Sequence, residues 1–127
     1  MYRYLLALLP LLILFACGKT NNAQGHNLYD KHCANCHMEE GEGLRNLIPP
    51  LAGADYLGEN PREVVRGIRY GMQGPILVNG TVYNEPMPGN AELSDFQIVN
   101  IVNYINQAWG NAYPPITVKE TREWLAE

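Results

Sequence analysis

The stretch Cys33-Ala34-Asn35-Cys36-His37 constrains this chain more than any other feature of its sequence. Two thiols separated by two residues can add across the two vinyl groups of a haem and form two thioether bonds. His37 directly follows that covalent attachment, so one of its ring nitrogens is placed to coordinate the iron. We therefore expect Cys33, Cys36 and His37 to hold one covalently attached haem.

Other uses of a Cys-x-x-Cys pair fit this chain less well. A zinc site needs four nitrogen or sulfur ligands, and the sequence has no second Cys-x-x-Cys pair and no His-x-x-x-His pair. A thioredoxin-like redox pair belongs in a βαβ context, which the later segments do not supply. A structural disulfide across so small a loop would contribute little stability.

The N-terminus has the composition of an export signal. A short positive start, Met1-Tyr2-Arg3, precedes an apolar run that ends at Ala16. The run is shorter than the roughly 20 residues that span a bilayer, but it fits a signal peptide. Leu14-Phe15-Ala16-Cys17 resembles the lipobox of bacterial lipoproteins, which implies cleavage before Cys17 and acylation of that residue. We expect residues 1–16 to be a signal peptide; the open alternative is a secretory signal with a spare thiol.

Residues 17–24 are small and polar, which predicts a flexible tether between the lipid anchor and a folded domain. Several acyl chains would give durable attachment to a membrane. Export also agrees with the haem interpretation, because haem of this kind is attached outside the cytoplasm in bacteria. Without residues 1–16 the chain has eight basic and thirteen acidic residues. This acidic balance argues against nucleic acid as a partner.

From Gly25 to His37 the sequence predicts one helix that runs into the haem motif. Gly25, Tyr29 and Cys33 follow one another at a spacing of four and so share a helical face. A glycine on such a face usually marks the close approach of another backbone. The pattern resembles the N-terminal helix of class I monohaem c-type cytochromes, where a glycine and an aromatic residue receive the C-terminal helix. The resemblance covers about residues 25–111 and implies a small all-α fold around one haem c.

The segment that follows an acidic, glycine-rich loop resembles another part of that family. Pro49-Pro50-Leu51-Ala52-Gly53 matches its Pro-x-Leu-x-Gly segment. The resemblance implies that the Pro49 carbonyl accepts a hydrogen bond from the second ring nitrogen of His37, which would orient the ring. It also implies that Leu51 lies against the haem plane. A plain loop with two prolines is the alternative.

Residues 61–70 are predicted to form a helix that lines the haem pocket. Asn60 is a suitable N-cap, Pro61 a suitable first residue, and Gly71 a suitable stop. Ile68 belongs to the apolar stripe of this helix, which in the family faces the haem. The stripe could equally be ordinary core.

A β-hairpin and a methionine segment come next. Ile76–Val78 and Thr81–Tyr83 flank Asn79-Gly80, which predicts a hairpin over residues 76–83 with a type I′ turn. Met87 lies between two prolines and resembles the family's axial-methionine segment, so it is the expected sixth iron ligand. Met72 is the competing methionine, although methionine is also a common core filler.

The two remaining histidines, His26 and His32, are further candidates for the sixth ligand in a bis-histidine haem. We expect both to lie on a solvated face. His32 in particular directly precedes Cys33 and would have to reach around the ring.

The sequence predicts a long helix after Ser94, which is an N-cap with Gln97 completing a capping box. This helix is expected to end near Trp109-Gly110 and to direct Tyr104 toward Gly25 and Tyr29. Residues 112–127 are expected to be a tail docked on the domain, with a short last helix capped by Thr117 and Glu120.

Ligation by His37 and Met87 would leave the iron with no open position, which predicts a one-electron carrier rather than an enzyme. The resemblance implies a quinol-oxidising complex or a dehydrogenase as electron donor and a terminal oxidase or reductase as acceptor. The protein would face the periplasm from its lipid anchor. A fixed subunit of a larger respiratory complex and a haem-based gas or redox sensor are the alternatives.

Overall fold

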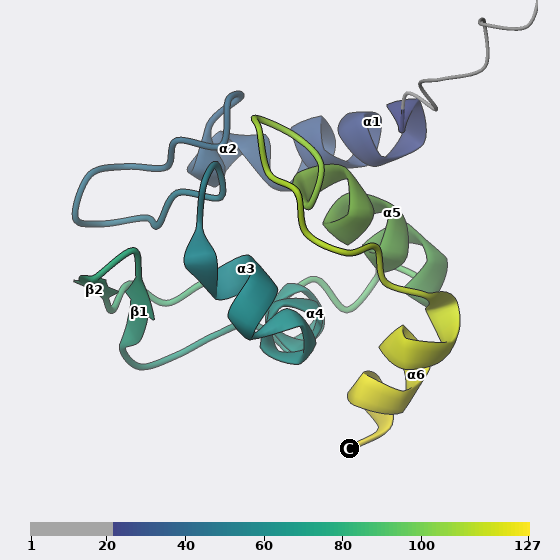
Figure 1. Ribbon diagram of the computed structural model, residues 1–127. Helices are drawn as coiled ribbons and strands as arrows, with labels where there is room; N and C mark the ends of the chain where they lie inside the picture. Colours follow the sequence, from purple (N-terminus) through teal and green to yellow (C-terminus); the bar gives the residue numbers. More distant parts are fainter. Residues whose placement is uncertain (1–21) are drawn as a thin grey trace, which may run out of the picture.

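The structure is a computed structural model that describes residues 22–127. The expected signal peptide, Cys17 and most of the expected tether therefore lie outside the described residues. Within them the chain forms six helices and one two-stranded sheet (Figure 1). In chain order the elements are α1 (Ala23–His32), α2 (Ala34–His37), α3 (Asp55–Glu59), α4 (Pro61–Tyr70), β1 (Ile76–Val78), β2 (Thr81–Tyr83), α5 (Asp95–Ile105) and α6 (Val118–Ala126). The predicted all-α fold with a short hairpin is confirmed.

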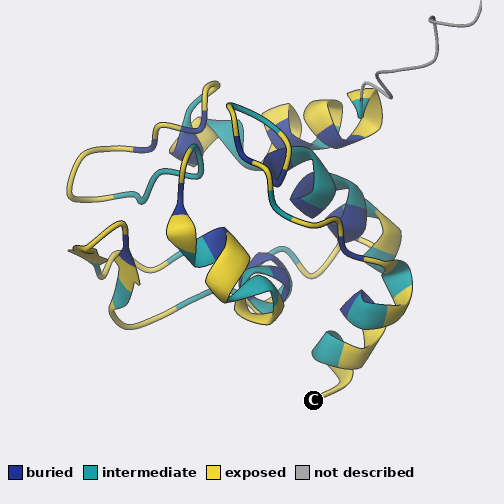
Figure 2. Ribbon diagram, in the orientation of Figure 1, coloured by how far each residue is buried: buried dark blue, intermediate teal, exposed yellow. Residues whose placement is uncertain are grey.

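The crossing of α1 and α5 organises the fold, and Gly25 permits it. A methyl group added at Gly25 would lie only 2.7 Å from Cβ of Tyr104 in α5, so a larger residue would force the two helices apart. The ring of Tyr29 is fully buried and lies 5.5 Å from the ring of Tyr104 and 5.0 Å from that of Trp109. Figure 2 shows buried residues on the faces that these helices turn inward. The predicted meeting of Tyr104 with Gly25 and Tyr29 is confirmed.

The helix predicted over residues 25–37 is not continuous. It begins at Ala23, because the Asn22 side chain accepts a hydrogen bond from the Gly25 backbone at 2.9 Å. It is interrupted at Cys33, whose φ of −124° lies outside the helical region. A separate turn, α2, then carries Cys36 and His37. The break redirects the chain, so the haem motif does not simply extend the axis of α1.

Helix α5 is shorter than predicted. Ser94 and Gln97 form the expected capping box at its start, but regular helix ends at Ile105 rather than near Trp109-Gly110. The chain turns there because the Asn106 carbonyl accepts a hydrogen bond from the Tyr113 backbone at 3.0 Å. Trp109 then adopts a positive φ of 51°, which takes its ring back toward α1.

The hairpin and α4 follow the sequence prediction closely. Leu77 pairs with Val82, and Asn79 and Gly80 both have positive φ, at 50° and 76°, as a type I′ turn requires. The hairpin is bonded to α3, because Asn79 and Asp55 exchange two hydrogen bonds of 2.8 and 3.0 Å. Helix α3 was not predicted from the sequence. Helix α4 has the predicted bounds, although the side chain of Asn60 makes no capping hydrogen bond.

The C-terminal tail forms the expected helix and is docked on the domain. Thr117 and Glu120 form a complete capping box at the start of α6. The helix packs against α4 and α5, with Thr121 fully buried in the contact. Trp124 is half-buried against the core, so the tail is an integral part of the fold.

Candidate haem-binding site

A mainly apolar cavity lies between the helices and the hairpin. The space between its walls is about 610 Å³, counting the part that opens to solvent. Fifteen residues line it: Cys33, His37, Pro49, Pro50, Leu51, Ala54, Tyr56, Leu57, Val64, Ile68, Met72, Ile76, Val78, Met87 and Ile105. The fold thus gathers the motif and the two methionines from three separate segments around one space.

His37 lies in the wall of this cavity with only 8% of its surface exposed. Its Nδ1 is 3.1 Å from the Pro49 carbonyl oxygen, so the hydrogen bond expected between these two residues is present. A carbonyl can only accept, so Nδ1 must carry the proton and the neutral ring keeps a free lone pair on Nε2. Burial lowers the pKa of His37, and the bond to Pro49 opposes that shift. The ring is therefore held uncharged and oriented, as a metal ligand must be.

The two motif cysteines differ in environment. Cys33 lines the cavity, and burial together with nearby Cys36 raises the pKa of its free thiol to about 12. Cys36 is exposed and is not among the cavity-lining residues. Both thiols are free in the structure and lie at the two ends of one helical turn. The arrangement leaves one inner and one outer attachment point beside His37.

The loop that carries Pro49 and Leu51 is fastened by Asn111, which the sequence interpretation did not single out. Nδ2 of Asn111 donates to the carbonyls of Leu51 and Ile105 at 2.9 and 2.8 Å. Its Oδ1 accepts from the Gly53 backbone at 2.8 Å. In the sequence, the only indication of this role is the position of Asn111 directly after Trp109-Gly110. Asn111 therefore joins the Pro-x-Leu-x-Gly loop to the end of α5.

Both candidate methionines reach the cavity, because they lie opposite one another in an isolated antiparallel bridge. The two backbones exchange hydrogen bonds of 2.9 and 3.0 Å. Residues paired this way project to the same side, which is why each lines the cavity. Met72 is seated on α4: a methyl group added at Gly67 would lie 2.6 Å from its sulfur. The side chain of Met72 thus packs on α4 at Gly67, whereas that of Met87 packs against the core.

The other two histidines lie away from the cavity. His26 is exposed, with its ring 5.1 Å from that of Tyr104 and its Nε2 3.6 Å from Asp30. His32 is exposed and its Nδ1 lies 3.4 Å from the amide nitrogen of Asn90. Neither lines the cavity, in agreement with the expectation that both face solvent.

Comparison with protein families decides what this site is. The family model for cytochrome c matches residues 22–109 of the chain. The chain belongs to the cytochrome c family. This cytochrome holds one covalent haem c, and the residues present fit that group, since the cavity has mainly apolar walls and is lined by Cys33 and His37 of the attachment motif.

Curated relatives of this cytochrome are of two kinds. Cytochrome c-552 of Thermus thermophilus is 38% identical over 114 residues, covering 83% of this chain and 86% of the relative. The cytochrome c subunit of the quinone alcohol dehydrogenase of Gluconacetobacter polyoxogenes is 38% identical over 103 residues, covering 80% of this chain but 22% of that subunit. The fructose dehydrogenase cytochrome subunit of Gluconobacter japonicus is 29% identical over 114 residues, again covering 22% of the relative. The similarity therefore covers most of cytochrome c-552 but only about a fifth of each dehydrogenase subunit.

Outside the haem site, the described part of this cytochrome contains no cluster of three or more His, Cys, Asp or Glu residues that could hold a metal ion. None of the helices within residues 22–127 is long and apolar enough to cross a membrane.

Proposed function

We propose that this cytochrome carries single electrons through a haem whose iron is bound by His37 and Met87. Haem c supplies an iron that gains and loses one electron. The observation that supports this assignment is that one apolar cavity receives an oriented histidine from α2 and a methionine from the segment bonded to the end of α4. In Figure 1, α2 lies in the upper part of the molecule and α4 below it.

The protein's own residues would set the properties of that site. The hydrogen bond to Pro49 makes the His37 ring a better donor of its lone pair and fixes its orientation. The thioether of Met87 is a soft ligand that favours the ferrous state and raises the reduction potential. With both ligands bound no position is open to substrate, which is the reason for proposing a carrier rather than an enzyme.

A matched pair of variants tests the methionine assignment. Met87→Leu removes the thioether with little change in volume, and we expect the methionine-to-iron charge-transfer band of the ferric protein to disappear and the potential to fall. Met72→Leu keeps the packing on Gly67 and should retain both properties. Loss of the band in Met72→Leu with retention in Met87→Leu would assign the ligand to Met72 instead.

We further propose that residues 1–16 are a signal peptide, that Cys17 is acylated, and that the domain faces the periplasm on a short tether. The support is the sequence Leu14-Phe15-Ala16-Cys17, which follows a short positive start and an apolar run. Cys17→Ser should move the haem-loaded protein from the membrane fraction to the soluble fraction. A variant that remains with the membrane at high salt would contradict lipid anchoring.

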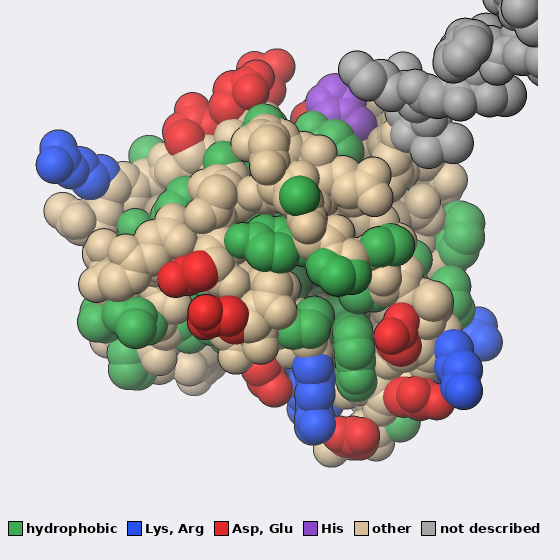
Figure 3. Space-filling view, in the orientation of Figure 1, with side chains coloured by type: hydrophobic (Ala, Val, Ile, Leu, Met, Phe, Trp, Pro, Cys, Tyr) green, Lys and Arg blue, Asp and Glu red, His purple; other side chains and the backbone are tan. Residues whose placement is uncertain are grey.

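The acidic loop after α2 is the proposed point of electrostatic attraction to a redox partner. Glu39, Glu40 and Glu42 are all exposed in this loop, and Figure 3 shows acidic side chains gathered at that end of the molecule. A basic surface on the partner would raise the association rate at low salt. Glu39→Gln with Glu40→Gln should reduce that salt dependence in stopped-flow measurements, whereas Glu123→Gln on α6 should not. Equal effects would refute a local patch.

A permanent place in a larger enzyme is the second candidate function, because several relatives are named as cytochrome subunits of dehydrogenases. The two candidates differ in assembly. Sedimentation of the mild-detergent extract should give a particle of about the mass of one chain and its detergent if the protein is a free carrier. Comigration with a dehydrogenase or oxidase activity would favour the subunit role.

A further inference from the structure

Polar contacts along α4 join it to the C-terminal end of α6. Nη1 of Arg66 donates to the Trp124 carbonyl at 2.8 Å, and the Tyr70 hydroxyl donates to the Leu125 carbonyl at 2.9 Å. Arg62 pairs with the side chain of Glu127 at 2.6 Å. Successive turns of α4 are thus bonded to the last residues of α6.

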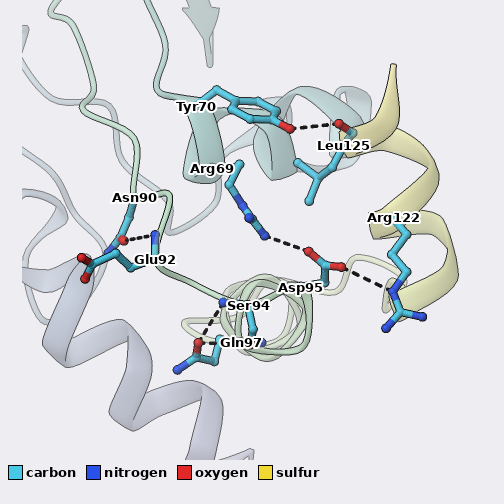
Figure 4. A network of polar contacts seen from close by, with 9 residues as sticks. All are labelled: Arg69, Tyr70, Asn90, Glu92, Ser94, Asp95, Gln97, Arg122 and Leu125. Atoms are coloured by element: carbon cyan, nitrogen blue, oxygen red, sulfur yellow. Dashed lines mark hydrogen bonds and ion pairs between the residues drawn. The ribbon is translucent and has the colours of Figure 1, made fainter.

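One carboxylate joins this pair of helices to α5. Asp95, the first residue of α5, accepts from Nη2 of Arg69 at 2.8 Å and from Nε of Arg122 at 3.4 Å. Figure 4 shows Asp95 between the two guanidinium groups, with Tyr70 and Leu125 meeting beside them. Arg69 is the more buried arginine, with 19% of its side chain exposed against 70% for Arg122. The Arg69–Asp95 pair is therefore the more buried of the two ion pairs that join α4, α5 and α6.

The residues around Arg69 also hold the segment that carries Met87. The Asn90 backbone donates to the Ile68 carbonyl at 2.8 Å, one residue before Arg69. Gly71, two residues after it, has a φ of +85°, and a methyl group there would lie 2.7 Å from the Met87 carbonyl oxygen. Met72 completes the attachment through its two backbone bonds to Met87. A shift at the end of α4 would therefore carry Met87 with it.

From this continuous set of contacts we infer that Arg69 is a positioning residue, which fixes the end of α4 to α5 and α6 and so holds the thioether of Met87 in the haem cavity. The inference rests on the proposed ligation by Met87. Asp95 and the C-terminal tail then influence the haem site indirectly, although neither lines the cavity.

The ion pair is poorly suited to a purely stabilising role. Nε of Arg69 is buried without a hydrogen-bond partner among the described residues, and leaving a buried donor unpaired opposes the gain from the pair. Replacing both partners of such a pair by apolar residues often changes global stability little, so the pair by itself is weak evidence for a purely stabilising role. The planar guanidinium of Arg69 instead fixes the orientation of α4 relative to α5.

Arg69→Gln in the haem-loaded, full-length protein tests the inference, with Arg45→Gln as control. Arg45 is exposed and makes no hydrogen bond or ion pair among the described residues, so the control changes the net charge equally. We expect Arg69→Gln to lower the temperature at which the methionine-to-iron charge-transfer band is half lost by about 5 °C or more, and to lower the reduction potential more than Arg45→Gln does. Helix unfolding followed by circular dichroism should shift less than the band.

Two further variants sharpen the result. Tyr70→Phe removes one bond between α4 and α6 and should shift the band midpoint in the same direction by a smaller amount. Arg69→Lys keeps the charge and should recover part of the shift. If the band and the helical signal shift together in Arg69→Gln, or if neither shifts, the inference is wrong. If the unmodified protein lacks the band, methionine ligation itself is wrong, and the two failures are thereby distinguished.

Discussion

The two sides of the haem cavity are built from different interactions. The side that carries His37 is held by neutral groups: the bond to Pro49, the Tyr29 hydroxyl on the Met38 carbonyl at 2.6 Å, and the three bonds of Asn111. The side that carries Met87 is held by a two-residue backbone bridge and by arginine ion pairs that are partly exposed.

The difference has a consequence for the behaviour of the two ligands. Buried neutral hydrogen bonds are costly to break because each leaves an unsatisfied group. Exposed ion pairs contribute little and weaken with salt. We therefore expect the hydrogen bonds around His37 to break only on global unfolding, and the contacts that hold Met87 to break before it.

Loss of the Asn111 side chain should have the largest effect on the fold. Asn111→Ala would leave the Ile105 carbonyl and the Gly53 N–H without partners, and the Leu51 carbonyl with only its 3.4 Å bond from the Ala54 backbone, which predicts a loss of about 3 kcal/mol in the free energy of unfolding. Denaturant titration of the ferric protein measures it. Asn84→Ala, at an exposed position, is the matched control. A loss of less than about 1 kcal/mol would show that the His37 side is not rigidly held.

Removal of one hydroxyl from the same side should have a smaller effect. Tyr29→Phe deletes the bond to the Met38 carbonyl and should cost about 1 kcal/mol of unfolding free energy, while the methionine charge-transfer band stays at its original position. Tyr83→Phe removes a hydroxyl for which the described residues offer no partner. If both variants lose the same stability, the bond to Met38 is not responsible.

High salt should weaken the Met87 side selectively. At about 1 M sodium chloride the Debye length is about 3 Å, so screening of the pairs at Asp95 should lower the half-loss temperature of the charge-transfer band by about 1–4 °C. Arg69→Gln, which removes one of the two pairs at Asp95, should reduce this response. A global unfolding temperature that falls as much as the band would remove the proposed contrast between the two sides.

Acid should have the smallest effect, through the cap of α6. Hydrogen bonds from Thr117 lower the pKa of Glu120 below its usual value of 4.5. The stabilisation from a carboxylate with a lowered pKa is present above that usual value and is lost as the pH falls through the lowered one. The unfolding temperature of Glu120→Gln should therefore approach that of the parent as the pH is lowered from 6 toward 3. Parallel curves over that interval would contradict a role for Glu120 ionisation.

Local patterns in the sequence were sufficient to predict the elements that local chemistry controls. The capping boxes at Ser94 and Thr117 need only residues three apart, and the Asn79-Gly80 turn needs only two residues that tolerate positive φ. The break at Cys33 and the early end of α5 were not predicted, because both depend on bonds that form only when the chain folds back. The Tyr113 backbone, for example, must reach the Asn106 carbonyl.

The candidate site divides in the same way. The sequence alone determined the attachment chemistry, since two thiols and a histidine at fixed spacing carry it whatever the rest of the chain does. It also pointed to Pro49 and Met87 through their resemblance to a family. Tertiary structure alone decided how these groups are held. Asn111 bonds to Leu51 across 60 residues, and Arg69 to Asp95 across 26. No local pattern specifies such partners, because their pairing depends on how the helices pack.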